Sequence, residues 1–300
     1  DVCSSDLLQH TSDLLLERQI PVVSGFGSVL SNVGETKNKG IEISLSSLNI
    51  NTKSFQWTTD VMFYANKESI ESLYNGKVDD IGNKWFIGHP INVHYDYEKI
   101  GIWQNTSEDL AEMEEFNKNG ANFKPGDIKI WDNGDKKITE ADRKILGSTS
   151  PKFIASMVNS ISYKGFDFSI FLYASVGAML NNNIEYLNKP GRANSIVIDY
   201  WTPTNPTNAY PRPSVDNASP AYVKSLQYEK ADFIRVRNIT LGYTLPEKLL
   251  KKIRARKIRV YLSANNPFVI TGFSGIDPEG ARGYTAPSAS TWMGGVNLSF

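Results

Sequence analysis

The sequence predicts an all-β chain whose strands form part of an antiparallel transmembrane β-barrel. The strongest strand runs from Asp232 to Pro246, where Ile234 and Val236 share one face and Arg235 and Arg237 share the other. This period of two is typical of a strand between an apolar and an aqueous environment. The connections between the expected strands also alternate between long and short, as extracellular loops and periplasmic turns do in bacterial barrels.

Counting backward from a periplasmic C-terminus sorts these connections into two groups. The expected outer connections are all long: Asn265 to Ser290, Gly177 to Glu229, Glu68 to Pro151 and the region Gln19 to Ser31. The expected inner connections are all short: Lys248 to Arg256, Lys164-Gly165 and the turn near Asn51. An interfacial aromatic girdle is expected at the inner strand ends: Phe55, Trp57, Tyr163, Phe166, Phe168, Tyr243 and Phe300. In a soluble sandwich, neither the length of the connections nor the position of the aromatic residues is expected to differ between the two ends of the strands.

In the first part of the chain, the pattern predicts three strands. A first strand is expected from Leu8 to Arg18, and the polar segment Gly34 to Gly40 is poorly patterned. Alternation over Ile41 to Leu45 then predicts a second strand that runs in the opposite direction. After a short turn, a long third strand begins at Phe55. That strand alternates through Phe63, which is long enough to cross a bilayer at the usual tilt.

The remaining elements follow in the same way. Within the long connection, Ile91 to Trp103 predicts strands that extend the sheet above the membrane, and Asp109 to Asn117 predicts a short helix. Phe153 to Tyr163 and Phe166 to Val176 predict a hairpin over a tight Lys-Gly turn.

The strand at Asp232 changes phase after Asn238, which one β-bulge would produce. Alternation over Ile258 to Ala264 and over Trp292 to Phe300 completes about eight strands. Between the strands at Asp232 and Ile258, the basic segment Lys248 to Arg259 is expected to be a solvated turn or short helix.

Composition excludes several classes of protein. The 300 residues include 32 basic and 32 acidic residues, so net charge gives no reason to propose a nucleic-acid partner. No run of 18 apolar residues is present, which excludes transmembrane helices. The single Cys3 cannot form an internal disulfide, and the three histidines are not at metal-ligand spacing. Motifs for serine hydrolases, zinc proteases, P-loops and dinucleotide sites are absent, so we expect no enzymatic activity.

One loop carries a candidate metal site. The segment Trp131 to Asp142 resembles a calcium-binding EF-hand loop, with Asn133, Asp135 and Asp142 at its third, fifth and twelfth places. Trp131 stands where the first carboxylate belongs and Lys136 replaces the turn glycine; a one-residue deletion that makes Asp132 the first ligand would explain both. The alternative is a turn-rich loop that has lost its metal.

Seven separated blocks resemble the C-terminal part of the SusC/RagA family of TonB-dependent outer-membrane transporters. They are NKGIEISL, FKPGDIKI, YKGFDFSIFLYASVG, DYWTPTNPTNAYPRP, DFIRVRNITLGYTLP, RVYLSANNPFVITGFSGIDPE and GGVNLSF, and they occur in the family's own order. The resemblance implies an integral barrel of the Gram-negative outer membrane, with residues 8–300 as its C-terminal portion and the plug and earlier strands absent. The opening DVCSSDL, residues 1–7, is what a common sequencing-adapter primer encodes, and we expect it to be an artefact.

The resemblance also implies a function and partners. A receptor of this family imports glycan oligosaccharides, or sometimes peptides, with energy from TonB and with a SusD-like lipoprotein lid. Candidate nutrient contacts are the aromatic residues of the outer loops, since sugar rings stack on aromatic faces: Trp103, Trp131, Tyr200, Trp201 and Tyr210. Packing of the long loops is the alternative role for each. A secreted or surface β-sandwich that binds carbohydrate is the alternative for the whole chain.

The last strand ends on an aromatic residue. Trp292, Val296, Leu298 and Phe300 fall on one face, and outer-membrane barrels resemble one another in such an ending. The resemblance implies recognition of this strand by the barrel-assembly machinery, because a terminal strand is the free edge of the unclosed sheet.

Overall fold

The computed structural model describes residues 2–12, 15–19, 28–32, 34–182, 198–213, 220–252, 255–279 and 288–300. Its centre is one antiparallel sheet of eight strands in the order β1-β4-β5-β10-β11-β14-β15-β16. These strands are β1 (Val2–Thr11), β4 (Gly34–Asn51), β5 (Phe55–Leu73), β10 (Phe153–Tyr163), β11 (Phe166–Val176), β14 (Phe233–Thr244), β15 (Lys257–Thr271) and β16 (Thr291–Ser299). Each of these eight strands, apart from the first and the last, pairs with the strand before it and the strand after it in this order along the chain, as in the wall of an up-and-down barrel.

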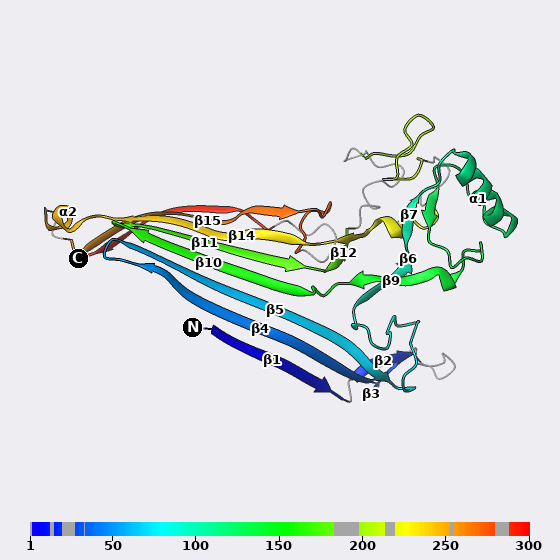
Figure 1. Cartoon of the computed structure of the whole chain (residues 1–300), viewed down its shortest axis with the longest axis horizontal. Coiled ribbons are helices and arrows are strands. Elements are labelled where there is room, and N and C mark those ends of the chain that lie inside the picture. The colour runs from blue at the N-terminus through cyan, green and yellow to red at the C-terminus, as the bar shows by residue number, and fades with distance from the viewer. Residues whose placement is uncertain are drawn as a thin grey trace.

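Most of the smaller elements lie at one end of the sheet, whereas α2 lies at the other end beside the C-terminus (Figure 1). Four two-stranded sheets pair β2 with β3, β6 with β9, β7 with β8 and β12 with β13. Their bounds are β2 (Leu15–Gln19), β3 (Ser28–Asn32), β6 (Val93–Tyr97), β7 (Lys99–Ile102), β8 (Ile128–Ile130), β9 (Arg143–Ser148), β12 (Met179–Asn181) and β13 (Tyr228–Lys230). The helices are α1 (Ser107–Lys118), α2 (Glu247–Lys252), η2 (Glu140–Asp142) and η4 (Val223–Leu226). In the described part of the chain, no helix has both the length and the apolar character needed to span a membrane.

The two faces of the large sheet differ in chemistry. One row across the sheet places Trp57 beside Ile161, then Phe168, Leu241 and Leu262 in turn. The neighbouring row on the other face runs from Thr58 through Ser160, Ser169, Thr240 and Ser263. Apolar residues on the first face are widely exposed, including Leu241, Leu262 and Val296. An exposed apolar face opposite a polar face is the pattern of a membrane barrel wall.

Short and long connections separate at opposite ends, as predicted (Figure 1). The turn between β10 and β11 is Lys164-Gly165, and both residues have positive φ, 46° and 91°. The predicted bulge in β14 is confirmed, because the register with β11 skips Arg237 between Val236 and Asn238.

Several strand bounds differ from the prediction. The first strand ends at Thr11 rather than Arg18, and Leu15–Gln19 is a separate strand. The polar segment Gly34 to Gly40 is the start of β4, while β5 continues to Leu73 and β15 to Thr271. These extensions are paired with neighbouring strands, so cross-strand pairing and not alternation within one segment determines them. The segment Ile91 to Trp103 does contain β6 and β7, but they form separate sheets instead of extending the large one. The helix predicted at Asp109 is confirmed as α1.

The outer elements have their own apolar core. One cluster joins Ile102, Ile128, Ile130 and Trp201, and a second joins Trp103, Met113, Phe116 and Phe123. Helix α1 begins where the Thr106 side chain accepts a hydrogen bond from the Asp109 backbone, and it buries Met113 and Phe116 against Trp103. The long connection is therefore a folded unit and not an extended loop.

A buried ion cluster ties the last outer connection to the sheet. The Arg235 guanidinium on β14 lies 2.6 Å from Asp277 Oδ1, and both side chains are almost fully buried. Arg235 Nε also lies 2.7 Å from Glu279 Oε2, although the two atoms are not aligned for a hydrogen bond. Arg237, the bulge residue, pairs with the same Glu279. Arg235 and Arg237 of β14 thus both reach the acidic segment Asp277–Glu279.

Candidate functional site

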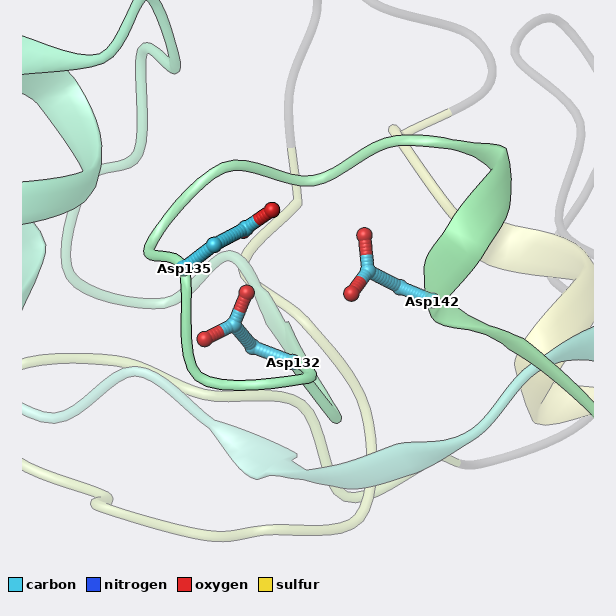
Figure 2. Close-up of side chains that lie close together, drawn as sticks. All are labelled: Asp132, Asp135 and Asp142. Carbon is cyan, nitrogen blue, oxygen red and sulfur yellow. The ribbon is translucent and has the colours of Figure 1, made fainter.

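The loop after β8 brings three carboxylates together. Asp132, Asp135 and Asp142 each offer an oxygen, and these oxygens lie within 4.8 Å of one another (Figure 2). Asp132 follows β8 closely, Asp135 lies at the tip of the loop, and Asp142 ends the short helix η2. The Thr139 side chain caps η2 by accepting from the Ala141 backbone N–H, and this cap fixes the position of Asp142.

Backbone hydrogen bonds hold the three side chains in place. Asp142 is fully buried, and its two oxygens accept from the backbone N–H groups of Asn133 (3.0 Å) and Thr139 (2.6 Å). Asp132 Oδ2 accepts from Gly134 (3.0 Å) and Lys136 (3.2 Å). The Asn133 amide oxygen accepts from the Asp135 backbone, so it shapes the loop.

The donor set fits a hard divalent cation. Asp132 Oδ1 is shielded from solvent and has no hydrogen-bond partner. Within the described residues, no lysine or arginine forms an ion pair with the three carboxylates, and the Lys136 ammonium bonds to Glu112 instead (2.8 Å). Calcium takes oxygen ligands at about 2.3–2.6 Å, so two ligands on one ion lie at most about 5 Å apart. The observed spacing meets this limit.

The two sequence departures have structural explanations. Asp132, and not Trp131, lies beside the other two carboxylates, in agreement with a one-residue deletion. Lys136 stands at the turn position with φ of 58°, in the left-handed region that glycine usually occupies. The loop has kept its turn without the glycine.

The five candidate nutrient contacts fall into two groups. Trp103 is 1% exposed and Trp201 is 6% exposed, so neither ring offers a face to a ligand. The expectation that they stack on sugars is therefore wrong for this structure, because both complete the core of the outer elements. Trp131 is half-buried beneath the Lys144 ammonium, 3.7 Å from the ring centroid. Tyr200 is exposed and forms a β-bridge with Tyr210.

Tyr210 lines a cavity of about 550 Å³ among the outer connections. Its wall includes Glu98, Lys99, Leu146, Met179, Ala209, Tyr210, Ser225, Leu226, Tyr228, Glu229 and Ser274. Burial lowers the pKa of Lys99, whose ammonium donates to the Asn208 and Ala209 carbonyls. Burial also raises the pKa of Tyr210, so its hydroxyl stays protonated. Sequence analysis missed most of this wall, since its residues come from separate connections and share no motif.

The last strand has the predicted faces. β16 pairs only with β15 in the described sheet, with Leu298 opposite Ile258 and Val296 opposite Val260. Trp292 and Phe300 are 62% and 75% exposed. Of the four residues predicted as an assembly signal, Trp292, Val296 and Leu298 thus lie on β16 and on the apolar face of the sheet, and Phe300 directly follows this strand.

Comparisons with known proteins agree with this architecture. No family model matches the chain. It is 33% identical over 286 residues to TonB-dependent receptor P3 of Formosa agariphila, a match that covers 90% of this chain and 28% of the relative. It is 30% identical over 309 residues to TonB-dependent receptor SusC of Bacteroides thetaiotaomicron, covering 97% of this chain and 29% of the relative.

A solved structure supports the fold. The chain superposes on the RagAB peptide importer in its open-open state with a TM-score of 0.77 and 25% identity, covering 100% of this chain and 33% of that chain. The chain therefore spans about a third of the length of the relatives it matches. This match confirms the predicted barrel class over the sandwich alternative. The relatives are named as receptors and transporters, in agreement with the expectation of a non-enzymatic protein. The chain is part of a TonB-dependent receptor and belongs to the SusC/RagA family.

Proposed function

We propose that the complete protein imports a nutrient across the outer membrane with energy from TonB. The observation that supports this most is the match to SusC and RagAB over nearly the whole chain, including the outer connections as well as the barrel wall. The imported nutrient is a glycan oligosaccharide or a peptide. The partners are a SusD-like lipoprotein, the TonB complex and the barrel-assembly machinery.

The cavity at Tyr210 is the proposed nutrient contact on this part of the receptor. It lies among the outer connections, where a ligand arriving from outside meets the protein first. Tyr210 and Tyr228 supply ring faces, while Glu98, Lys99 and Glu229 supply hydrogen-bonding groups. Mixed aromatic and polar walls suit both sugar rings and peptide backbones. Tyr200 and Trp131 are further contacts.

The test uses the native bacterium with the full-length gene deleted. Growth on single glycans and on defined peptides should be lost for one nutrient and restored by the wild-type gene. Complementation with Tyr210→Ala should restore growth only at higher nutrient concentration. Tyr74→Ala, an exposed tyrosine that is not in the cavity wall, is the matched control and should behave as wild type. Unchanged growth of the deletion strain on every nutrient would contradict the import function.

We also propose that Asp132, Asp135 and Asp142 bind calcium. Support comes from the converging carboxylates and from the unpartnered, shielded oxygen of Asp132. Asn133 then supports the loop through its side chain and is not required as a ligand. Calcium would offset two of the three like charges and fasten the start of the loop to η2. Its role would be structural.

A further inference from the structure

The inner turns of the sheet carry a concentration of positive charge. The connecting segments 52–54, 164–165 and 245–257 contain eight lysines and arginines and one glutamate. The long connection at the opposite end, residues 74–150, contains ten basic and fourteen acidic residues. Basic residues are therefore in excess at the end that carries α2 and the C-terminus, whereas acidic residues are in excess in this outer connection (Figure 1).

The three turns form one continuous rim. The Lys164 backbone N–H donates to the Ser54 carbonyl (3.2 Å), which links the first turn to the second. The Thr244 N–H donates to the Gly165 carbonyl (2.8 Å), which links the second turn to the end of β14. The Arg256 N–H donates to the Ser299 carbonyl (2.7 Å), which links the third turn to the last strand.

Five exposed side chains define this basic rim: Lys53, Lys164, Lys248, Lys251 and Arg256. In the part of the chain that the structure describes, none of the five forms an ion pair with an acidic residue. A row of cations without acidic partners repels itself unless anions lie nearby.

Exposed aromatic residues lie immediately beside the rim. Tyr163, Phe166 and Phe300 are 46%, 52% and 75% exposed, and the Lys164 ammonium lies 5.1 Å from the Tyr163 ring centroid. Exposed aromatic rings at strand ends mark the level of the lipid headgroups. Cations next to such rings therefore lie at headgroup depth, where phosphate groups are the available anions.

We infer that the basic rim binds the headgroups of anionic phospholipids in the leaflet at the inner end of the barrel. The inference rests on the proposed outer-membrane function for its orientation. A zwitterionic headgroup has no net charge to match the rim, whereas phosphatidylglycerol has one negative charge. The rim would thereby fix the depth of the barrel wall in that leaflet.

The experiment titrates purified full-length receptor in detergent with phosphatidylglycerol and with phosphatidylethanolamine, and measures each Kd by native mass spectrometry. Wild type should prefer phosphatidylglycerol by about tenfold or more, since each cation near an anionic surface contributes about 1 kcal/mol. A variant with Lys53→Gln, Lys248→Gln, Lys251→Gln and Arg256→Gln should lose that preference.

The matched control removes the same number of charges from exposed lysines at the outer end: Lys77→Gln, Lys118→Gln, Lys124→Gln and Lys137→Gln. It should keep the wild-type preference. Heat-modifiable gel mobility checks that each variant is a folded barrel. Equal affinity of wild type for the two lipids, or an unchanged preference in the rim variant, would overturn the inference. Growth on the nutrient reports on import separately, so either proposal can fail without the other.

Discussion

Removing calcium from the Asp132–Asp142 loop should loosen it, and the structure sets the size of the effect. Three carboxylates with oxygens within 4.8 Å repel one another when no cation lies between them. At that separation the repulsion between two unit charges is about 3.5 kcal/mol at an effective dielectric constant of about 20. Hydrogen bonds from the loop backbone offset part of this cost, but Asp132 Oδ1 receives none.

The stability that calcium adds to the folded loop depends on the affinity for calcium. Extracellular calcium modules bind with Kd values of about 10⁻⁴–10⁻³ M. At 1 mM calcium and a Kd of about 0.1 mM, binding stabilises the folded loop by about 1.4 kcal/mol. Hydrogen exchange of residues 131–142 that requires opening of the loop should then be roughly tenfold slower than in EDTA.

The assay compares purified full-length receptor in calcium and in EDTA by hydrogen exchange, with calorimetric titration of calcium in parallel. Asp135→Asn removes one charge but keeps an oxygen for the Lys137 backbone N–H, so it should weaken calcium binding without unfolding the loop. The matched control is Asp79→Asn, since Asp79 accepts from the Ile87 N–H in another outer turn. No heat on titration, together with identical exchange in calcium and EDTA, would refute the calcium proposal and favour a loop that has lost its metal.

Deleting Phe300 or changing it to Asp should lower the amount of folded receptor in purified outer membranes far more than Ser299→Ala does; equal assembly would remove the proposed role of the terminal aromatic. A single cysteine at Asn122 should react with an impermeant reagent on intact cells, whereas one at Lys251 should not; the opposite result would reverse the topology. Asp277→Asn leaves the buried Arg235 with Glu279 as its remaining partner. The loss of stability should therefore lie near the lower end of the ~3–5 kcal/mol that breaking a buried ion pair costs. Faster hydrogen exchange across residues 272–279 measures that cost, and unchanged exchange would show that the ion pair does not hold this segment.

Sequence periodicity predicted the barrel wall well wherever one face meets lipid. The hairpin from Phe153 to Val176 has the predicted bounds, because apolar and polar residues alternate along both strands. The same rule failed for Gly34 to Gly40, where apolar and polar residues do not alternate and pairing with β5 decides the structure. Strand pairing is a property of two segments, so the pattern of one segment cannot reveal it.

The candidate sites also differ in whether the sequence of one segment is enough to predict them. The candidate calcium loop is local, and its three carboxylates come from within twelve neighbouring residues, so their spacing could be recognised from the sequence. The aromatic candidates are not local. Trp103 and Tyr210 look alike in sequence, since both lie in polar outer connections. Only the fold shows that Trp103 packs against Phe116 and Phe123 while Tyr210 faces a cavity.

The cavity itself depends on contacts among outer connections that leave the barrel wall at different strands. Glu229, in the middle of β13, accepts hydrogen bonds from Asn182 after β12 and from both the hydroxyl (2.7 Å) and the backbone N–H (2.9 Å) of Ser274 after β15. One carboxylate therefore joins segments separated by more than forty residues on either side. These segments meet because β11, β14 and β15 are neighbours in the sheet, and β11 and β15 end at the level where β14 begins. The register of these strands thus positions the segments that line the cavity, although none of the eight strands of the large sheet contributes a residue to its wall.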